Sequence, residues 1–298
     1  MWIVKHRRIF LGISLALMIL SAVALFVWGL QPGIEFTGGT LIEVSYEREL
    51  PEHGDVKGRL ENMAIGTFTL QQNDESGYLI RTRDLREEER VSLLEAISFE
   101  GNTAIQERVN TIGPSIGEEL RNKSYLAILI VVLAIILFIT FSFRKVSKPV
   151  SSFKYGLVAI ATLIHDILIP TGFFVLLGQI THAEVDVLFV TALLAILGFS
   201  VNDTIIVFDR IRENLRTNED LGKVEKFRDV VGKSLSQTIV RSINTSLTTL
   251  VVLLSLFLLG GDSTKLFALT LVIGVIAGTY SSLFLASPLL IWLAPKEE

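Results

Sequence analysis

Three ionisable residues fall inside or beside long apolar runs, where a charge is unfavourable. Asp166 and Asp203 each interrupt a hydrophobic stretch, and Arg241 stands at the start of another. Placing a charged side chain at the centre of a bilayer costs about 3 kcal/mol on insertion scales. Residues of this kind are therefore candidates for binding and passing protons or ions across a membrane.

Asp166 lies about 12 residues into its apolar run, or about 18 Å along a helix, which is near the middle of a membrane. His165 precedes it, and Pro170 follows four residues later. Because proline lacks the N–H that would bond to the carbonyl of Asp166, the helix is locally opened beside the carboxylate. The alternative is a structural carboxylate that is hydrogen-bonded to a neighbouring helix.

Asp203 lies about five residues, or about 8 Å, from the end of its apolar run, too deep to reach water easily. Asn202 stands beside it, and Arg241 is at a similar depth in the next run. A carboxyl group that can pair with a cation at this depth is suited to proton exchange. The alternatives are a polar cluster that packs helices, and an interfacial arginine whose guanidinium extends to the membrane surface.

A polar stripe follows Arg241 along its helix. Asn244, Thr245 and Thr248 stand three, four and seven residues beyond it, so all four share one helical face. Because a polar stripe in contact with lipid is unfavourable, we expect it to face another helix or a cavity. The predicted proton-coupling residues are Asp166, Asn202, Asp203, Arg241, Asn244 and Thr245.

Six apolar stretches are each long enough to cross the hydrocarbon core, which takes about 20 residues. They cover approximately 9–30, 125–143, 154–177, 187–208, 239–260 and 265–293. The first stretch could instead be a signal peptide, because Ala22-Val23-Ala24 is typical of a cleavage site. Its apolar run continues to Leu30, which favours a membrane span.

Basic residues predict the orientation of these spans. They gather before the first span, in segment 144–153 and in segment 209–238, whereas segment 178–186 has none. Both termini are therefore predicted to face the cytoplasm. Segment 209–238 is predicted to be an amphipathic interfacial helix that lies on anionic lipid.

Segment 31–124 is predicted to be an acidic domain outside the membrane. It holds 10 basic and 18 acidic residues, against a net charge of −4 for the whole chain. Its pattern predicts strands at 40–46, 67–71, 78–82 and 104–112 and helices at 53–64 and 87–98. The order βαββαβ is typical of a ferredoxin-like α+β domain.

The chain is thus predicted to be an α-helical polytopic membrane protein with one inserted domain. The predicted parts are 1–30 with the first span, the outer domain 31–124, and 125–298 with the other five spans. Gly33, Glu35, Gly38 and Gly39, and Gly113 with Pro114, are expected to form the linkers of the outer domain.

The last span carries small residues at every fourth position, a pattern that allows close helix packing. They are Thr270, Gly274, Gly278, Ser282 and Ala286. A tight pair is expected, with another helix of this chain or of a partner.

Several kinds of chemistry have no support in the sequence. There is no cysteine, so disulfides and cysteine-based zinc sites are excluded. His53 has no second metal ligand near it, and no Gly-rich Lys-Ser/Thr loop for ATP is present. No catalytic residues, metal, cofactor or nucleic-acid partner are predicted.

Six motifs in order resemble the SecD/SecF family of protein-export membrane subunits. They are Gly33–Thr40, Thr111–Gly117, His165-Asp166, Ser200–Asn214, Arg241–Thr249 and Gly278–Ser282. Glu35 departs from the family's usual aspartate. The resemblance covers essentially the whole chain, and Ser200–Asn214 is its most specific part.

The resemblance implies a six-span half that pairs with a similar SecD half and belongs to the resistance-nodulation-division superfamily. It also implies association with the SecYEG channel, with YajC and YidC as further candidates, and with translocating polypeptides. Asp203 and Arg241 match positions implicated in proton passage. A small-molecule or lipid exporter of that superfamily, and a non-transporting assembly factor, are the two alternatives.

Overall fold

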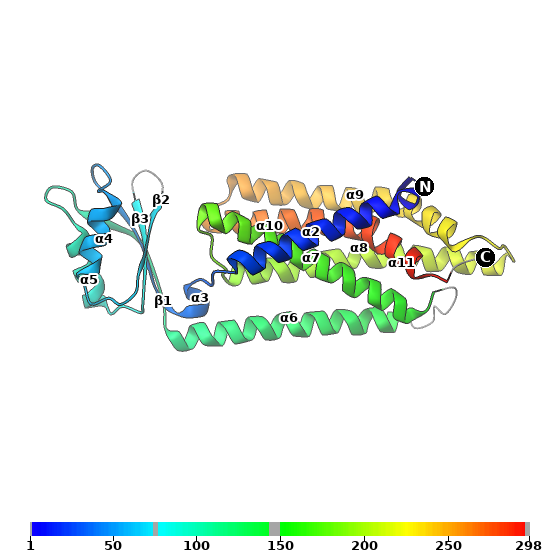
Figure 1. Cartoon of the computed structure of the whole chain (residues 1–298), viewed down its shortest axis with the longest axis horizontal. Helices are drawn as coiled ribbons and strands as arrows, with labels where there is room; N and C mark the ends of the chain where they lie inside the picture. Colours follow the sequence, from blue (N-terminus) through cyan, green and yellow to red (C-terminus); the bar gives the residue numbers. More distant parts are fainter. Residues whose placement is uncertain (1, 74–76, 143–149, 296–298) are drawn as a thin grey trace. The chain divides into compact units, whose positions relative to one another are not determined.

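The computed structural model describes residues 2–73, 77–142 and 150–295 (Figure 1). The chain divides into two compact units. One contains Met1–Gln31 and Leu126–Glu298, and the other contains Pro32–Tyr125. The predicted basic loop at 144–153 falls largely outside the described residues.

Six helical stretches among the described residues are long and apolar enough to cross a membrane, which confirms the six predicted spans. They are α2 (Arg7–Trp28), α6 (Pro114–Ser142), α7 (Ser152–Thr181), α8 (Val187–Asp220), α9 (Phe227–Leu259) and Thr264–Leu293. The sixth span comprises most of α10 (Asp262–Tyr280), the π-helical segment η1 (Ser281–Ala286) and α11 (Ser287–Leu293). The chain is a multi-pass membrane protein.

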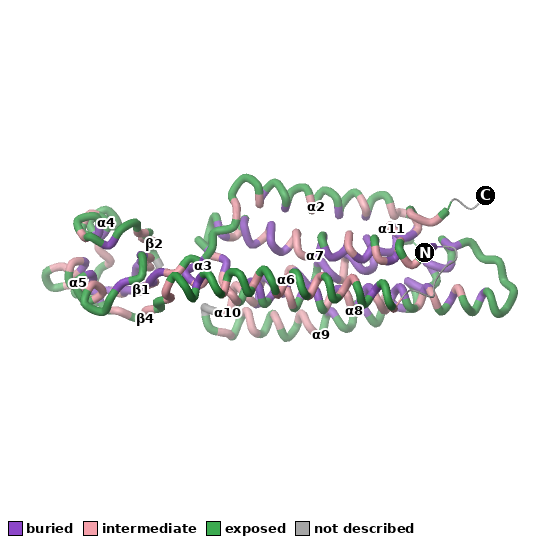
Figure 2. The backbone as a smooth tube through the Cα atoms, turned by 90° about the horizontal axis from the view of Figure 1, so that it is seen from below, coloured by how far each residue is buried: buried purple, intermediate pink, exposed green. Residues whose placement is uncertain are grey.

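The spans differ in how much of their surface the chain itself covers (Figure 2). About half of the most apolar stretch of α7, of α8 and of the sixth span is buried, whereas only 6% of that of α6 is. A helix that is apolar on all sides and little covered by its own chain is suited to lipid or to a partner. The three most buried spans therefore form the interior in which a polar site can be kept from lipid.

Segment 209–238 is not the separate interfacial helix that the sequence predicts. α8 continues without a break to Asp220, and α9 begins at Phe227. Phe227, Val231 and Leu235 are buried in the same apolar core as Ile211 of α8. The core also takes in Ile3 and Val4 of the short helix α1 (Trp2–Lys5). The apolar face that suggested contact with lipid is covered by protein instead.

The second unit has the predicted βαββαβ order, preceded by the short helix α3 (Ile34–Thr37). Its elements are β1 (Gly39–Tyr46), α4 (His53–Glu61), β2 (Thr69–Asn73), β3 (Gly77–Thr82), α5 (Glu87–Ile97) and β4 (Ala104–Ile112). The sheet order is β2-β3-β1-β4, and each neighbouring pair is antiparallel. This arrangement agrees with the expected ferredoxin-like domain.

The register of the sheet follows from the alternation in β1. Ile42, Val44 and Tyr46 are buried and join Val56 and Leu60 of α4 in one apolar core. The intervening β1 residues are only half-buried. Burial raises the pKa of Tyr46 to about 12, and its hydroxyl donates to the carbonyl of Ile97 at 3.1 Å. Helix α4 ends three residues earlier than predicted, and β2 starts two residues later, because Gly66 turns the chain at a φ of +76°.

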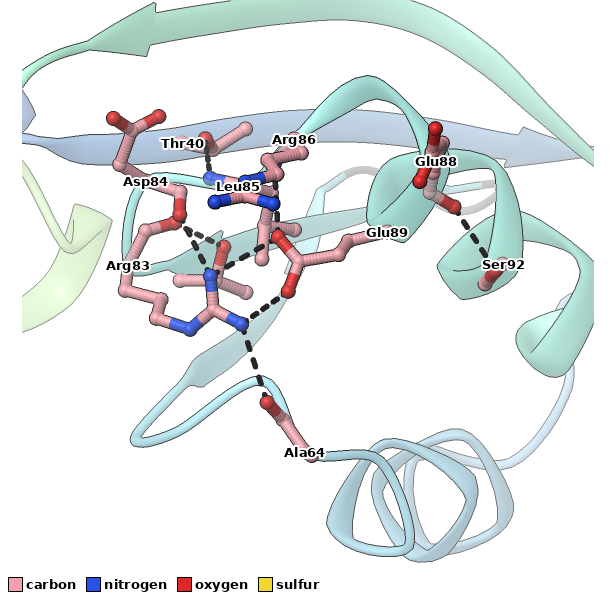
Figure 3. Close-up of polar contacts among 10 residues, drawn as sticks. Thr40, Ala64, Arg83, Asp84, Leu85, Arg86, Glu88, Glu89 and Ser92 are labelled. Atoms are coloured by element: carbon pink, nitrogen blue, oxygen red, sulfur yellow. Dashed lines mark hydrogen bonds and ion pairs between the residues drawn. The ribbon is translucent and has the colours of Figure 1, made fainter.

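Glu89 connects the first turn of α5 to the preceding loop by hydrogen bonds (Figure 3). Its Oε2 accepts the backbone N–H of Arg86 at 2.9 Å and Nη1 of Arg83 at 3.1 Å, and its Oε1 accepts Nη2 of Arg83. Nη2 of Arg83 also donates to the carbonyl of Ala64 at 3.3 Å. The hydrogen bonds from Arg83, and then that from Arg86, lower the pKa of Glu89 from 4.5 to about 2.

This geometry predicts how the outer domain responds to acid. Because the folded-state pKa of Glu89 is depressed, its contribution to stability is complete above pH 4.5 and is lost as the pH falls towards 2. Glu89→Gln should lower stability at neutral pH and flatten the pH dependence across that interval. The check is pH-dependent thermal unfolding of the full chain. Glu88→Gln, on the exposed side of the same turn, is the control, and equal pH profiles for the wild type and Glu89→Gln would contradict the assignment.

Candidate proton-coupling site

Asp203 lies on α8 with only 2% of its surface exposed. Its Oδ2 is buried and has no hydrogen-bond partner among the described residues. Ser242 Oγ of the adjacent helix α9 is also buried, and its hydroxyl lies close enough to act on the Asp203 carboxyl group. A buried carboxylate oxygen without a partner is unfavourable, so its retention calls for a functional explanation.

Arg241 does not form the predicted ion pair with Asp203. These two described residues are not within ion-pair distance, although the guanidinium is near enough for its charge to act on the carboxyl group. The reason is rotation about the axis of α9. Consecutive helical residues point about 100° apart. Ser242 and Ser246 occupy the buried face of α9, which leaves Arg241 on an exposed one.

The rest of the predicted stripe shares the exposed position of Arg241. Asn244, Thr245 and Thr248 are all exposed, as is Asn202 of α8. The stripe therefore does not face a helix of its own chain. A row of polar groups on the outside of an apolar helix is suited to contact with another protein chain.

Asp166 is completely buried and accepts hydrogen bonds from three elements. Ser200 of α8 donates to its Oδ2, and Ser281 of η1 donates to the same oxygen at 2.9 Å. Nδ1 of His165 lies 2.8 Å from its Oδ1. The structure therefore contains the interhelical hydrogen bonds that the alternative reading of Asp166 requires. We call Asp166, His165, Ser200 and Ser281 the Asp166 cluster.

The small-residue face of the sixth span packs against α8. A Cβ on Gly274 would collide with Ile196, and one on Gly278 would lie 3.0 Å from Cβ of Ser200. Ser282 Oγ is 3.2 Å from Oγ1 of Thr204. The contacts repeat every four residues on both helices, so this face forms a tight pair within the chain.

The predicted linkers of the outer domain contact each other. Gly38 and Gly39 have φ angles of +72° and +127°, which favour glycine. A Cβ on Gly38 would lie 2.8 Å from Cα of Pro114, and one on Gly117 would lie 2.7 Å from N of Gly38. Gly33, Glu35 and Gly113 adopt ordinary backbone angles. A hinge role for these residues stays a prediction.

The sequence did not indicate the serines that complete the site, which are Ser200, Ser242 and Ser281. A usable signal was present, because each of them lies within one of the motifs Ser200–Asn214, Arg241–Thr249 and Gly278–Ser282. Serine is so often an ordinary packing residue in membrane helices that this signal is weak. Within the described part of the chain, no group of three or more His, Asp or Glu residues could hold a metal ion.

Two family patterns match the chain. Residues 94–296 match the C-terminal part of protein export membrane protein SecD/SecF, and residues 23–49 match the SecD/SecF GG motif. The chain belongs to the SecD/SecF family. The second match contains Gly38 and Gly39, whose positive φ angles were described above.

Curated relatives in the SecD/SecF family are similar over almost their full length. "Protein translocase subunit SecF" of Thermobaculum terrenum is 39% identical, with 97% of this chain and 92% of the relative covered. The protein of the same name from Pseudomonas aeruginosa is 36% identical, with 98% and 91% covered. These relatives are named as translocase subunits, and the similarity supports a role in protein export.

The fold also matches solved structures of the family. A crystal structure of SecDF, a translocon-associated membrane protein from Thermus thermophilus, has a TM-score of 0.81 and 31% identity over 97% of this chain. A second SecDF structure, in a super-membrane-facing form, has a TM-score of 0.66. This chain spans only 38% of the length of either SecDF chain.

Proposed function

We propose that this chain is a proton-motive-force-coupled subunit of the protein-export machinery. The observation that carries the proposal is the Asp203 carboxyl group, which is buried with an unpartnered oxygen in a multi-pass membrane protein of the SecD/SecF family. Buried ionisable groups in membrane helices mark proton relays. Asp203 binds and releases protons, and the charge of Arg241 biases that equilibrium.

We propose a SecD half as the partner that covers the polar stripe of α9. Arg241, Asn244 and Thr245 are exposed on an otherwise apolar helix, and Asn202 is exposed on α8. A partner at this surface would remove these polar groups from lipid. It would also place the coupling site between two halves, as in transporters built from parallel repeats. The single-chain SecDF structures, of which this chain matches 38%, support this choice of partner.

We further propose that the chain resides in the cell inner membrane with both termini in the cytoplasm. The support is the concentration of Lys and Arg near the N-terminus and between α8 and α9, against none in 178–186. The acidic domain at 31–124 then lies outside, where it contacts translocating polypeptides as they leave the SecYEG channel. YajC and YidC are candidate further subunits of the same assembly.

The driving force sets the size of the expected effect. One proton that crosses 100 mV releases about 2.3 kcal/mol, which corresponds to about 50-fold in rate. Asp203→Asn keeps the size and polarity of the side chain but cannot ionise. Export that depends on the proton-motive force should therefore lose up to this factor.

The test measures export of a secreted reporter with and without a proton-motive force in membranes that carry Asp203→Asn. Asp220→Asn is the matched control, because Asp220 ends the same helix beyond its apolar part. Co-purification of the membrane partners is measured in parallel. If export of the Asp203→Asn variant keeps its full response to the proton-motive force, the chain is an assembly factor. If a small molecule or lipid is exported instead, the superfamily alternative holds.

A further inference from the structure

Asp166 is the second carboxyl group in the interior of the membrane unit, and it is set apart from Asp203 by its complete set of partners. It lies at the meeting point of α7, α8 and η1 and has no exposed surface. Asp203, by contrast, has an oxygen without a partner. Protonation would therefore alter existing hydrogen bonds at Asp166, whereas Asp203 Oδ2 has none to alter.

Ser281 has two acceptors for one hydroxyl proton. Its Oγ lies 2.9 Å from Asp166 Oδ2 and 3.0 Å from the carbonyl oxygen of Gly278. A hydroxyl donates one hydrogen bond, so these acceptors compete. An ionised carboxylate is the stronger acceptor, whereas a protonated one loses most of that advantage.

Ser281 is also the first residue of the π-helical segment η1 in the sixth span. Segments of this kind are rare and are frequently found at functional sites. The carbonyl of Gly278 accepts from Ser282 Oγ at 2.7 Å as well. Whether the Ser281 hydroxyl donates to Asp166 or to the Gly278 carbonyl therefore changes the hydrogen bonding at the start of η1.

His165 supplies a route for a proton to Asp166. Its Nδ1 is 2.8 Å from Asp166 Oδ1, and its Nε2 is buried without a hydrogen-bond partner. The ring stacks on Tyr280, with centroids 6.1 Å apart and planes at 14°. With the proton of a neutral imidazole on Nδ1, Nε2 is a free acceptor.

We infer that His165 and Asp166 form a second proton-binding centre, in which proton uptake moves the Ser281 hydroxyl from Asp166 to the Gly278 carbonyl and resets η1. The inference rests on the proposed function, because it presumes that protons reach the interior of this chain. A proton adds to Nε2 of His165, and the Nδ1 proton passes to Asp166 Oδ1. The histidine ends neutral with its proton on Nε2, and Asp166 ends as a carboxylic acid.

Few other ionisable groups face this centre. Tyr280 stacks on His165, and Asp203 follows Ser200 by one turn of α8. Among the described residues, the buried faces of α2, α10, η1 and α11 contribute serines, one threonine and apolar residues only. The ionisable side chain in direct contact with Asp166 is His165.

The test is infrared difference spectroscopy of the full chain in lipid vesicles, titrated over roughly pH 5 to 8. The wild type should show the carbonyl band of a carboxylic acid that grows as the pH falls, and Asp166→Asn should lose that band while Asp203→Asn keeps it. His165→Gln, which retains a donor but has no ring nitrogen to take up a proton, should move the midpoint at which the band appears. An identical titration in the wild type, Asp166→Asn and His165→Gln would overturn the inference.

Hydrogen exchange at the two ends of the titration tests the link to η1. Amides of Gly278–Ala286 should exchange differently at low and high pH in the wild type and equally in Ser281→Ala. The matched variant Ser282→Ala should keep the pH difference, because the Ser282 hydroxyl bonds to Thr204 and to the carbonyl of Gly278. Persistence of the pH difference in Ser281→Ala would overturn the switch. If the wild type shows no carboxylic acid band from Asp166 while Asp203→Asn has the expected export defect, this inference alone is refuted. A titrating Asp166 with normal export in Asp203→Asn would refute the proposed function instead.

Discussion

Replacing Gly274 by alanine is expected to destabilise the helix bundle by about 2 kcal/mol, the usual size of an overpacking effect. A Cβ at this position would overlap both Cγ1 and Cδ1 of Ile196. Ile196 is fully buried on α8, so its side chain has little room to move away. The two helices must separate or Ile196 must leave its rotamer, and both responses weaken the packing that surrounds the Asp166 cluster.

A second substitution separates overpacking from other effects of alanine. Ile196→Ala removes the three atoms that would lie nearest to the new Cβ, so the double variant should recover part of the loss. Gly198→Ala on α8 is the control, because nothing lies within 4 Å of its Cβ position and alanine favours helix. The measurement is thermal unfolding of the purified chain in detergent. Equal stabilities of Gly274→Ala and Gly198→Ala would contradict the close pairing of α8 with the sixth span.

Replacing Gly39 by alanine is expected to cost the outer domain about 3 kcal/mol, the upper range for a backbone held in a strained region. Gly39 begins β1 with a φ of +127°, which other residues rarely adopt. A Cβ there would also lie 2.5 Å from the carbonyl oxygen of Thr82, which is backbone and cannot rotate aside. The start of β1 would have to part from β3.

Hydrogen exchange of the β1 and β3 amides in the full chain measures this effect. Exchange should rise in Gly39→Ala and stay at the wild-type level, or fall, in Gly58→Ala. Gly58 lies in α4 with nothing within 4 Å of its Cβ position, so alanine there should favour the helix. Unchanged exchange in Gly39→Ala would show that the start of β1 tolerates a side chain, which would contradict the prediction.

The spans and the outer sheet could be predicted from the sequence because each depends on a local pattern. A run of about 20 apolar residues is long enough to cross a membrane whatever its neighbours are. The alternation in β1, with Ile42 and Val44 on one face, likewise indicates a half-buried strand.

The predictions that were wrong concern what covers each face of a helix. Amphipathic character in 209–238 shows that an apolar face exists, but not whether lipid or protein covers it. Here Ile3 and Val4, far away in the sequence, share one buried core with Phe227, Val231 and Leu235 of the segment. Counting residues along each helix put Asp203 and Arg241 at the same depth. It could not predict in which direction around the helix axis each side chain points. The π-helical segment η1 (Ser281–Ala286) was not predicted, because it contains no glycine or proline to mark a departure from the α-helix.

Proton entry into sealed vesicles that contain this chain with its membrane partner, under an imposed membrane potential, tests the central claim most directly. A pH-sensitive dye inside the vesicles reports the flow. We predict potential-driven acidification with the wild-type chain, and none above the lipid background with Asp203→Asn at equal protein content. Equal acidification in the two preparations would contradict a proton-coupling role for Asp203.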